Sequence, residues 1–119
     1  DTNPIIYYLK KEVGIVSILA PFLSIYPPPF VASVTELELF SSTSLTPVDV
    51  AEIEFLLTMV AVIPLDSQIA RIAARIRREH RLKVPDSIIA ATALFTHSTL
   101  LTRNTRDFKK ISELVVRGV

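Results

Sequence analysis

The sequence predicts an α/β protein in which a mostly parallel sheet is covered by helices, and three observations support this class. Short apolar, β-branched runs alternate with longer segments of helical pattern, an order typical of parallel strands joined by helices. Proline follows a capping residue at several expected helix starts. The chain has 119 residues, half of them apolar, which is enough for one core and too few for two. We therefore expect one domain over residues 1–119.

The first half of the chain is expected to hold four helices and two strands. Asn3 before Pro4 is typical of a helix start with Asn3 as the N-cap. Prolines at 27–29 end the second helix and force extended backbone. Ser33 or Thr35 can cap the third helix, and Ser33 with Glu36 fits a capping box. The expected helices are 4–9, 13–26, 34–41 and 47–58, and the expected strands are 30–33 and 59–63.

The second half continues with two helices, a strand, a helical turn and a last strand. Asp66 is the expected N-cap of a helix to about residue 81, whose apolar residues follow helical spacing. An apolar helix then runs to residue 94, with Pro85 at its first position and Asp86 in its first turn. We expect a strand over 99–102, a helical turn over 105–111 and a strand over 114–116.

Composition excludes several classes of protein. The absence of cysteine excludes a disulfide framework and thiolate metal sites and fits a reducing cytosol, so we expect a cytoplasmic protein. Two histidines are too few for a histidine-rich zinc centre. No apolar run reaches the roughly 18 residues of a membrane span, and no signal peptide is visible.

Charge is divided unevenly along the chain. Residues 1–66 hold two bases and eight acids, and residues 67–119 hold eleven bases and four acids, so the two parts carry −6 and +7. Such asymmetry favours a basic face that meets a polyanion, although a solvated helix surface gives the same pattern. The candidate nucleic-acid contacts are Arg75, Arg78, Lys83, Arg103 and Arg106.

Four acids stand where expected strands end and helices begin: Asp1, Glu38, Asp86 and Asp107. Sites in open α/β sheets form at this edge, so the four side chains are expected to converge. Carboxylates packed together repel one another, and a hard dication such as Mg²⁺ or Mn²⁺ removes that repulsion. The alternative for Asp86 is an aspartate that only caps its helix.

Four segments resemble the acidic motifs of PIN-domain ribonucleases, most closely the toxin half of VapBC-type toxin–antitoxin pairs. They are Asp1-Thr2-Asn3, the stretch SVTELEL at 33–39, the stretch PDSIIAATA at 85–93 and the stretch TRNTRDF at 102–108. Each motif alone is weak, but all four occur in the family's order and spacing, over essentially the whole chain. The resemblance implies a three-layer α/β/α domain with a mostly parallel central sheet.

The resemblance also implies a toxin that is a divalent-metal-dependent endoribonuclease and cuts structured RNA such as transfer or ribosomal RNA. By it, the four acids hold Mg²⁺ or Mn²⁺, and Asn3 and Thr102 support the site through hydrogen bonds. Asn104 either approaches the metal or braces Asp107. The implied partners are the RNA substrate, a cognate antitoxin and a second copy of the chain.

The sequence departs from the family at its start. Family members begin with a short apolar strand ahead of the first aspartate, and here Asp1 is the first residue. We expect that strand to lie upstream of this sequence. Two other interpretations remain: a catalytically silent PIN-like module that binds RNA or protein, and a phosphatase or exonuclease that uses the same acids.

Overall fold

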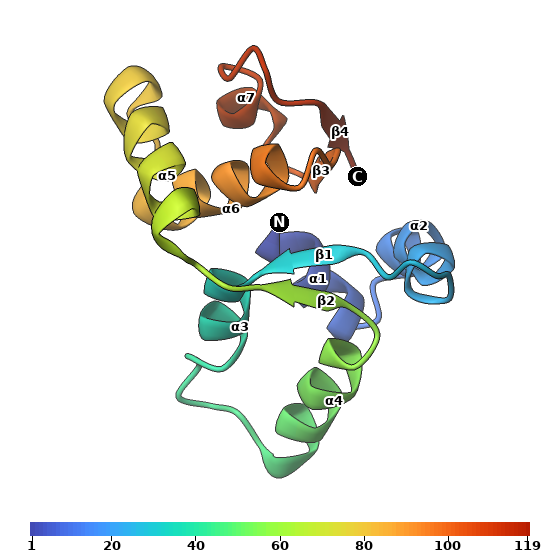
Figure 1. Cartoon of the computed structure of the whole chain (residues 1–119). Helices are drawn as coiled ribbons and strands as arrows, with labels where there is room; N and C mark the ends of the chain where they lie inside the picture. Colours follow the sequence, from blue (N-terminus) through green and yellow to red (C-terminus); the bar gives the residue numbers. More distant parts are fainter.

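The computed structural model describes every residue from Asp1 to Val119, in seven helices and four short strands (Figure 1). The helices are α1 (Thr2–Leu9), α2 (Val13–Leu23), α3 (Ser33–Leu39), α4 (Pro47–Leu57), α5 (Ser67–His80), α6 (Val84–Phe95) and α7 (Thr105–Phe108). The strands are β1 (Phe30–Ala32), β2 (Ala61–Ile63), β3 (Leu100–Thr102) and β4 (Val116–Gly118). Each expected element has a counterpart, although the last strand lies two residues later than expected, and this confirms the α/β class. None of the seven helices combines the length and the hydrophobicity that a membrane span requires.

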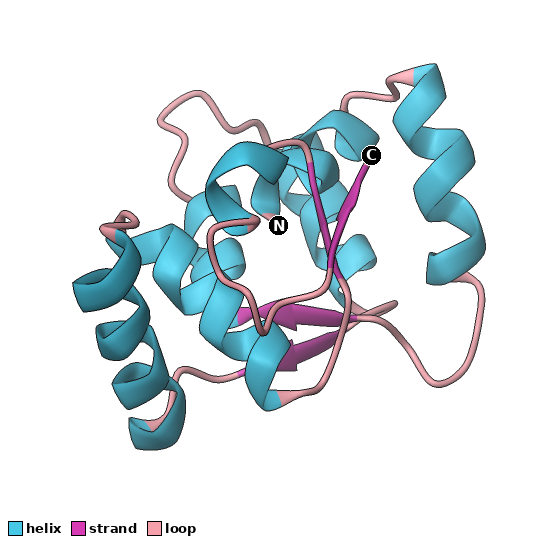
Figure 2. Ribbon diagram, turned by 90° about the horizontal axis from the view of Figure 1, so that it is seen from above, coloured by secondary structure: helices cyan, strands magenta, loops and turns pink.

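The strands pair in parallel, as expected, but in two separate pairs (Figure 2). In one pair Phe30 of β1 lies opposite Ala61 of β2. In the other, Leu100 of β3 lies opposite Val116 of β4. No ladder joins β1 to β3, so the strands do not form one continuous sheet.

Helix α6 lies at the centre of the core. Every residue from Ser87 to Ala93 is buried, and Ala90 and Ala91 are fully so. Their small side chains let neighbouring elements approach closely, and α6 packs against α5, α3 and β1. Phe108 of α7 and Ile76 of α5, both completely buried, complete the same core. The core therefore fixes the start of α6, where Asp86 lies.

The expected N-cap Asp66 is confirmed, and α4 also begins with a capping residue. Thr46 and Asp49 form a capping box at the start of α4, with hydrogen bonds of 2.9 and 3.1 Å between side chain and backbone. Asp66 caps α5 by accepting the N–H of Ile69 at 2.9 Å. Helix α6 begins at Val84, one residue earlier than expected.

Two other expected caps are wrong. Helix α1 is capped by Asp1, whose carboxylate accepts the N–H of Thr2 at 2.7 Å, and Asn3 lies inside the helix with an exposed side chain. Ser33 does not cap α3, because its hydroxyl accepts the N–H of Leu65 at 3.1 Å, beyond the end of β2. A contact across 32 positions of the chain thus replaces the local capping box.

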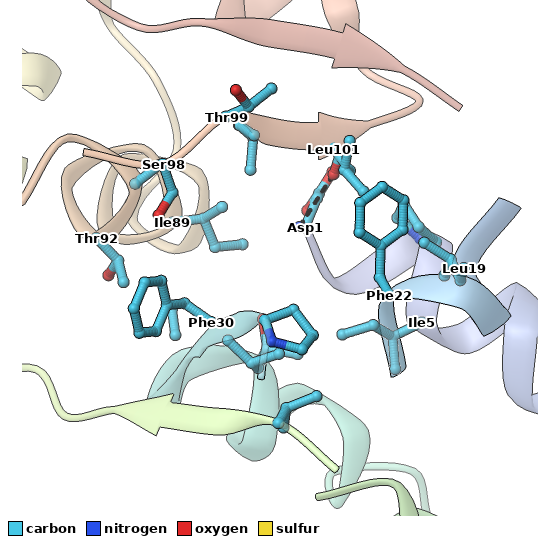
Figure 3. A pocket seen from close by; sticks show the side chains of 18 of the residues that line it. Asp1, Ile5, Leu19, Phe22, Phe30, Ile89, Thr92, Ser98, Thr99 and Leu101 are labelled. Atoms are coloured by element: carbon cyan, nitrogen blue, oxygen red, sulfur yellow. Dashed lines mark hydrogen bonds between the residues drawn. The ribbon is translucent and has the colours of Figure 1, made fainter. Parts of the chain in front are cut away.

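A largely apolar cavity of about 510 Å³ separates the two pairs of strands (Figure 3). Residues of β1 and β3 line it, together with Ile89 of α6 and Asp1. Each of the two strands is paired on one side only, and the α-amino group of Asp1 donates a hydrogen bond to the carbonyl oxygen of Leu101 at 3.2 Å. The chain therefore begins in a gap that is bordered by two half-paired strands.

This gap predicts the effect of a short extension. Five apolar, β-branched residues added ahead of Asp1 are expected to raise the midpoint of thermal unfolding by roughly 5–10 °C. The added segment would pair with β1 and β3, cover the apolar lining of the cavity and replace a buried amino group by an amide. An extension of five glycine and serine residues is the matched control for differential scanning calorimetry. Equal midpoints for the two extended chains would refute the prediction.

Candidate active site

Asp1 is held at the end of β3 through its carboxylate. One oxygen accepts the N–H of Thr2, and the other accepts the hydroxyl of Thr102, both at 2.7 Å. Thr102 is completely buried and accepts the N–H of Asn104 at 2.9 Å. Burial lowers the pKa of the Asp1 α-amino group to about 6, against the opposing effect of the carboxylates of Glu38 and Asp86. The first acid of the expected quartet is therefore fixed in place by backbone and side-chain hydrogen bonds, and its amino group is mostly uncharged at neutral pH.

Glu38 lies on the exposed side of α3 and is held from α1. The hydroxyl of Thr2 donates to its Oε1 at 2.7 Å, and the same hydroxyl is 2.8 Å from the hydroxyl of Thr35. Both threonines are buried. Sequence reasoning missed this pair. The available signal was their spacing, because Thr2 follows Asp1 directly and Thr35 precedes Glu38 by one helical turn.

Asp86 stands half-buried in the first turn of α6. Its pKa is raised, first by burial and then by the negative charges of Glu38 and Asp107, whereas nearby Lys83 acts in the opposite direction. No hydrogen bond holds its carboxylate in the structure, in contrast to those of Asp1 and Glu38. The charges of Glu38 and Asp107 therefore both reach Asp86, and together with burial they disfavour its ionised form.

Asp107, in α7, is held by its neighbours. The side-chain amide of Asn104 donates to it at 3.0 Å, and Lys110 lies 3.4 Å away. These contacts, Asn104 first, lower its pKa together with the charge of Arg106. Of the two roles left open for Asn104, the structure shows the bracing one.

The four acids have the donor chemistry of a magnesium site, although they do not form a compact cluster. No three Asp, Glu or His side chains lie close enough together to enclose an ion. Mg²⁺ typically keeps several waters and binds proteins through one or two carboxylates, so it does not need such a cage. The carboxylates present therefore have the ligand chemistry that suits a hydrated dication.

Some of the other expected site residues lie near the acids, and others do not. The side chain of Asn3 makes no hydrogen bond, because it points to solvent while its neighbour Thr2 turns inward. Lys83 and Arg106 lie near enough to Asp86 and Asp107 to affect their pKa values, and Arg78 is exposed.

Two of the expected RNA contacts are engaged within the protein. Arg75 forms ion pairs with Glu79 at 3.3 Å and Glu113 at 3.4 Å. Arg103 pairs with Glu12 and stacks on the ring of Tyr7, 4.2 Å from its centroid. The free positive charge beside the acids is therefore carried by Lys83 and Arg106.

Comparison with known families settles the class of this fold. The model of the PIN domain matches residues 1–114. The chain belongs to the PIN-domain family. The resemblance seen in the four acidic segments is thereby confirmed. No curated protein shows significant similarity to the chain.

Solved structures of similar PIN domains come from bacterial toxin–antitoxin complexes. A DNA-bound VapBC from Salmonella typhimurium has 26% identity and a TM-score of 0.84, over 99% of this chain and 94% of that one. A toxin–antitoxin complex from Klebsiella pneumoniae has 28% identity and a TM-score of 0.80, over 97% and 92%. VapBC2 from Rickettsia felis, bound to a promoter DNA fragment, has a TM-score of 0.83 over 99% and 95%; at 20% identity it shows the fold alone.

Proposed function

We propose that this PIN domain is the toxin of a toxin–antitoxin pair and a metal-dependent endoribonuclease that hydrolyses phosphodiester bonds in structured RNA, transfer or ribosomal. The observation that supports it most is the environment of Asp86, a carboxyl group whose pKa is raised by burial and by the charges of Glu38 and Asp107. Acids that repel one another on a PIN fold are the arrangement that a dication stabilises.

In this proposal Asp1, Glu38, Asp86 and Asp107 hold Mg²⁺ or Mn²⁺. A dication held by these residues would lower the pKa of a bound water and offset negative charge on the leaving oxygen. Thr102 orients Asp1, Thr2 orients Glu38 and Asn104 orients Asp107. Lys83, Arg106 and Arg78 then attract the phosphate backbone to the acids.

The proposed protein partner is an antitoxin, as in the complexes named for the similar structures from Klebsiella and Salmonella. An apolar groove between α1, α2 and α4 supports it, with Val48 and Phe55 of α4 exposed along the groove. Large exposed apolar patches commonly mark protein interfaces. A second copy of the chain remains an expected partner.

Metal removal tests the activity. Purified protein with Mg²⁺ is expected to cut end-labelled transfer RNA internally, and EDTA is expected to reduce the rate at least ~100-fold. Excess Mn²⁺ should then restore cleavage. Trimming from the RNA ends would indicate an exonuclease instead, and cleavage that is unchanged by EDTA would contradict the metal mechanism.

A catalytically silent binding module is the second candidate, and one observation favours it. No three of the acids form a compact cluster that could enclose an ion. Calorimetry with Mn²⁺ separates the two functions. A nuclease site should release or absorb heat on binding and shift thermal unfolding upward, whereas a silent module should do neither.

A further inference from the structure

Two buried threonines connect α1 and α3 beside the acidic site. Thr2 is the first residue of α1, and Thr35 lies in the middle of α3. The two helices pack against each other (Figure 1). Their hydroxyl oxygens are 2.8 Å apart, and that of Thr2 is also 2.7 Å from Oε1 of Glu38. The exposed fractions of Thr2 and Thr35 are 4% and 2%, so water has little access to either hydroxyl.

Counting protons fixes the direction of these hydrogen bonds. A hydroxyl carries one proton to donate, and an ionised carboxylate only accepts. The proton of Thr2 is therefore used in the hydrogen bond to Glu38. The remaining contact, between the two hydroxyls, must then be donated by Thr35. The order is Thr35 to Thr2 to Glu38, and a donor that is itself hydrogen-bonded in this way becomes a stronger donor.

Packing alone does not account for a threonine at position 35. Valine has nearly the same shape and would fill the same buried space without a polar atom. The hydroxyl of Thr35 makes one hydrogen bond in the structure, the one to Thr2. The Thr35 hydroxyl therefore acts on Thr2, and through Thr2 on the carboxylate of Glu38.

We infer that Thr35 is a positioning residue of the acidic site, which acts through Thr2 to hold Oε1 of Glu38 and so orients this carboxylate for binding a metal ion. This inference rests on the proposed function, since it assigns the Thr35 hydroxyl to metal binding. Neither threonine touches the metal in this scheme. Of the three linked side chains only Glu38 would contact the metal, together with the other acids of the site, and its orientation would be set from the interior of the protein.

The test compares Thr35→Val with Thr35→Ser and with the control Thr92→Val. Thr92 is equally buried, but its hydroxyl donates to the carbonyl oxygen of Ile88 within α6. Titration calorimetry with Mn²⁺ and no RNA is expected to show about tenfold weaker binding for Thr35→Val. Thr35→Ser and Thr92→Val should stay within about twofold of the wild type. Rescue by serine is the result that a purely structural role would not give.

A second measurement needs no metal. The side-chain carboxyl ¹³C resonance of Glu38, recorded by NMR in the metal-free protein, is expected to move in Thr35→Val and to stay in place in Thr35→Ser and Thr92→Val. Should Thr35→Val not fold, Thr35→Ala replaces it, because alanine and serine differ by the one hydroxyl.

The outcomes separate this inference from the proposed function. Wild-type Mn²⁺ affinity in Thr35→Val, with the Glu38 resonance unmoved, would overturn the inference and leave the nuclease proposal intact. A wild type that does not bind Mn²⁺ would overturn the nuclease proposal, and with it the metal-binding part of the inference. The Glu38 resonance would then still decide whether Thr35 acts on that carboxylate.

Discussion

Asp86→Asn is expected to lower RNA cleavage at least ~100-fold while the protein stays folded. The carboxylate of Asp86 is the one acid of the four without a hydrogen bond in the structure, so it is the most available to a metal ion. Asparagine has nearly the same shape as aspartate but carries no charge, so the attraction between position 86 and the dication is lost. Initial rates on end-labelled RNA with Mg²⁺ measure the loss. Glu54→Gln, which neutralises an exposed acid of α4 outside the site, is the matched control.

The same substitution should stabilise the metal-free protein at neutral pH. Folding raises the pKa of Asp86 above 3.8, so the folded state disfavours its charged form. The penalty is absent well below pH 3.8, grows as the pH rises through the raised pKa, and is fully present at neutral pH. Asp86→Asn should therefore melt at a higher temperature than the wild type at pH 7, and the difference should shrink on acidification. A loss of stability at pH 7 would contradict this account of the site.

Phe108→Ala is expected to lower the free energy of unfolding by about 3–5 kcal/mol. Phe108 is completely buried in the central core and follows Asp107 directly in α7. The substitution leaves a cavity that rigid neighbours cannot fill and loosens the helix that carries one of the four acids. Urea unfolding measures the change.

Phe55→Ala is the control for this loss, because Phe55 is 67% exposed. Its unfolding free energy should change by less than about 1 kcal/mol. If the two variants were equally stable, the position of Phe108 in the core would be wrong.

The local pattern of the sequence predicted the helices and strands well. The start of α6 was predicted to within one residue from Pro85 and Asp86. A proline and an acid in the first turn are local signals, since they lie within a few residues of each other. The last strand was misplaced: it runs from Val116 to Gly118, beside β3. Leu114, expected in that strand, is instead buried in the core. The pairing with β3 fixed the position of the strand, and single-sequence patterns carry no information on pairing.

Contacts between distant segments explain the other differences. Ser33 bonds to the backbone of Leu65 and therefore cannot cap α3. Arg75 and Arg103 were expected to meet RNA, but each has an acidic partner far away in the chain, Glu113 and Glu12. The motifs of the sequence indicated the four acids and Thr102. The link from Thr35 through Thr2 to Glu38 depends on the packing of α1 beside α3, so only the structure shows it.

Anomalous diffraction from crystals soaked in Mn²⁺ tests the central claim most directly, namely that acids far apart in the sequence form one dication site. The account predicts a single strong anomalous peak in contact with the carboxylate of Asp86 and with at least one of Asp1, Glu38 and Asp107. A peak that lies away from these carboxylates, or no peak at saturating Mn²⁺, would contradict it.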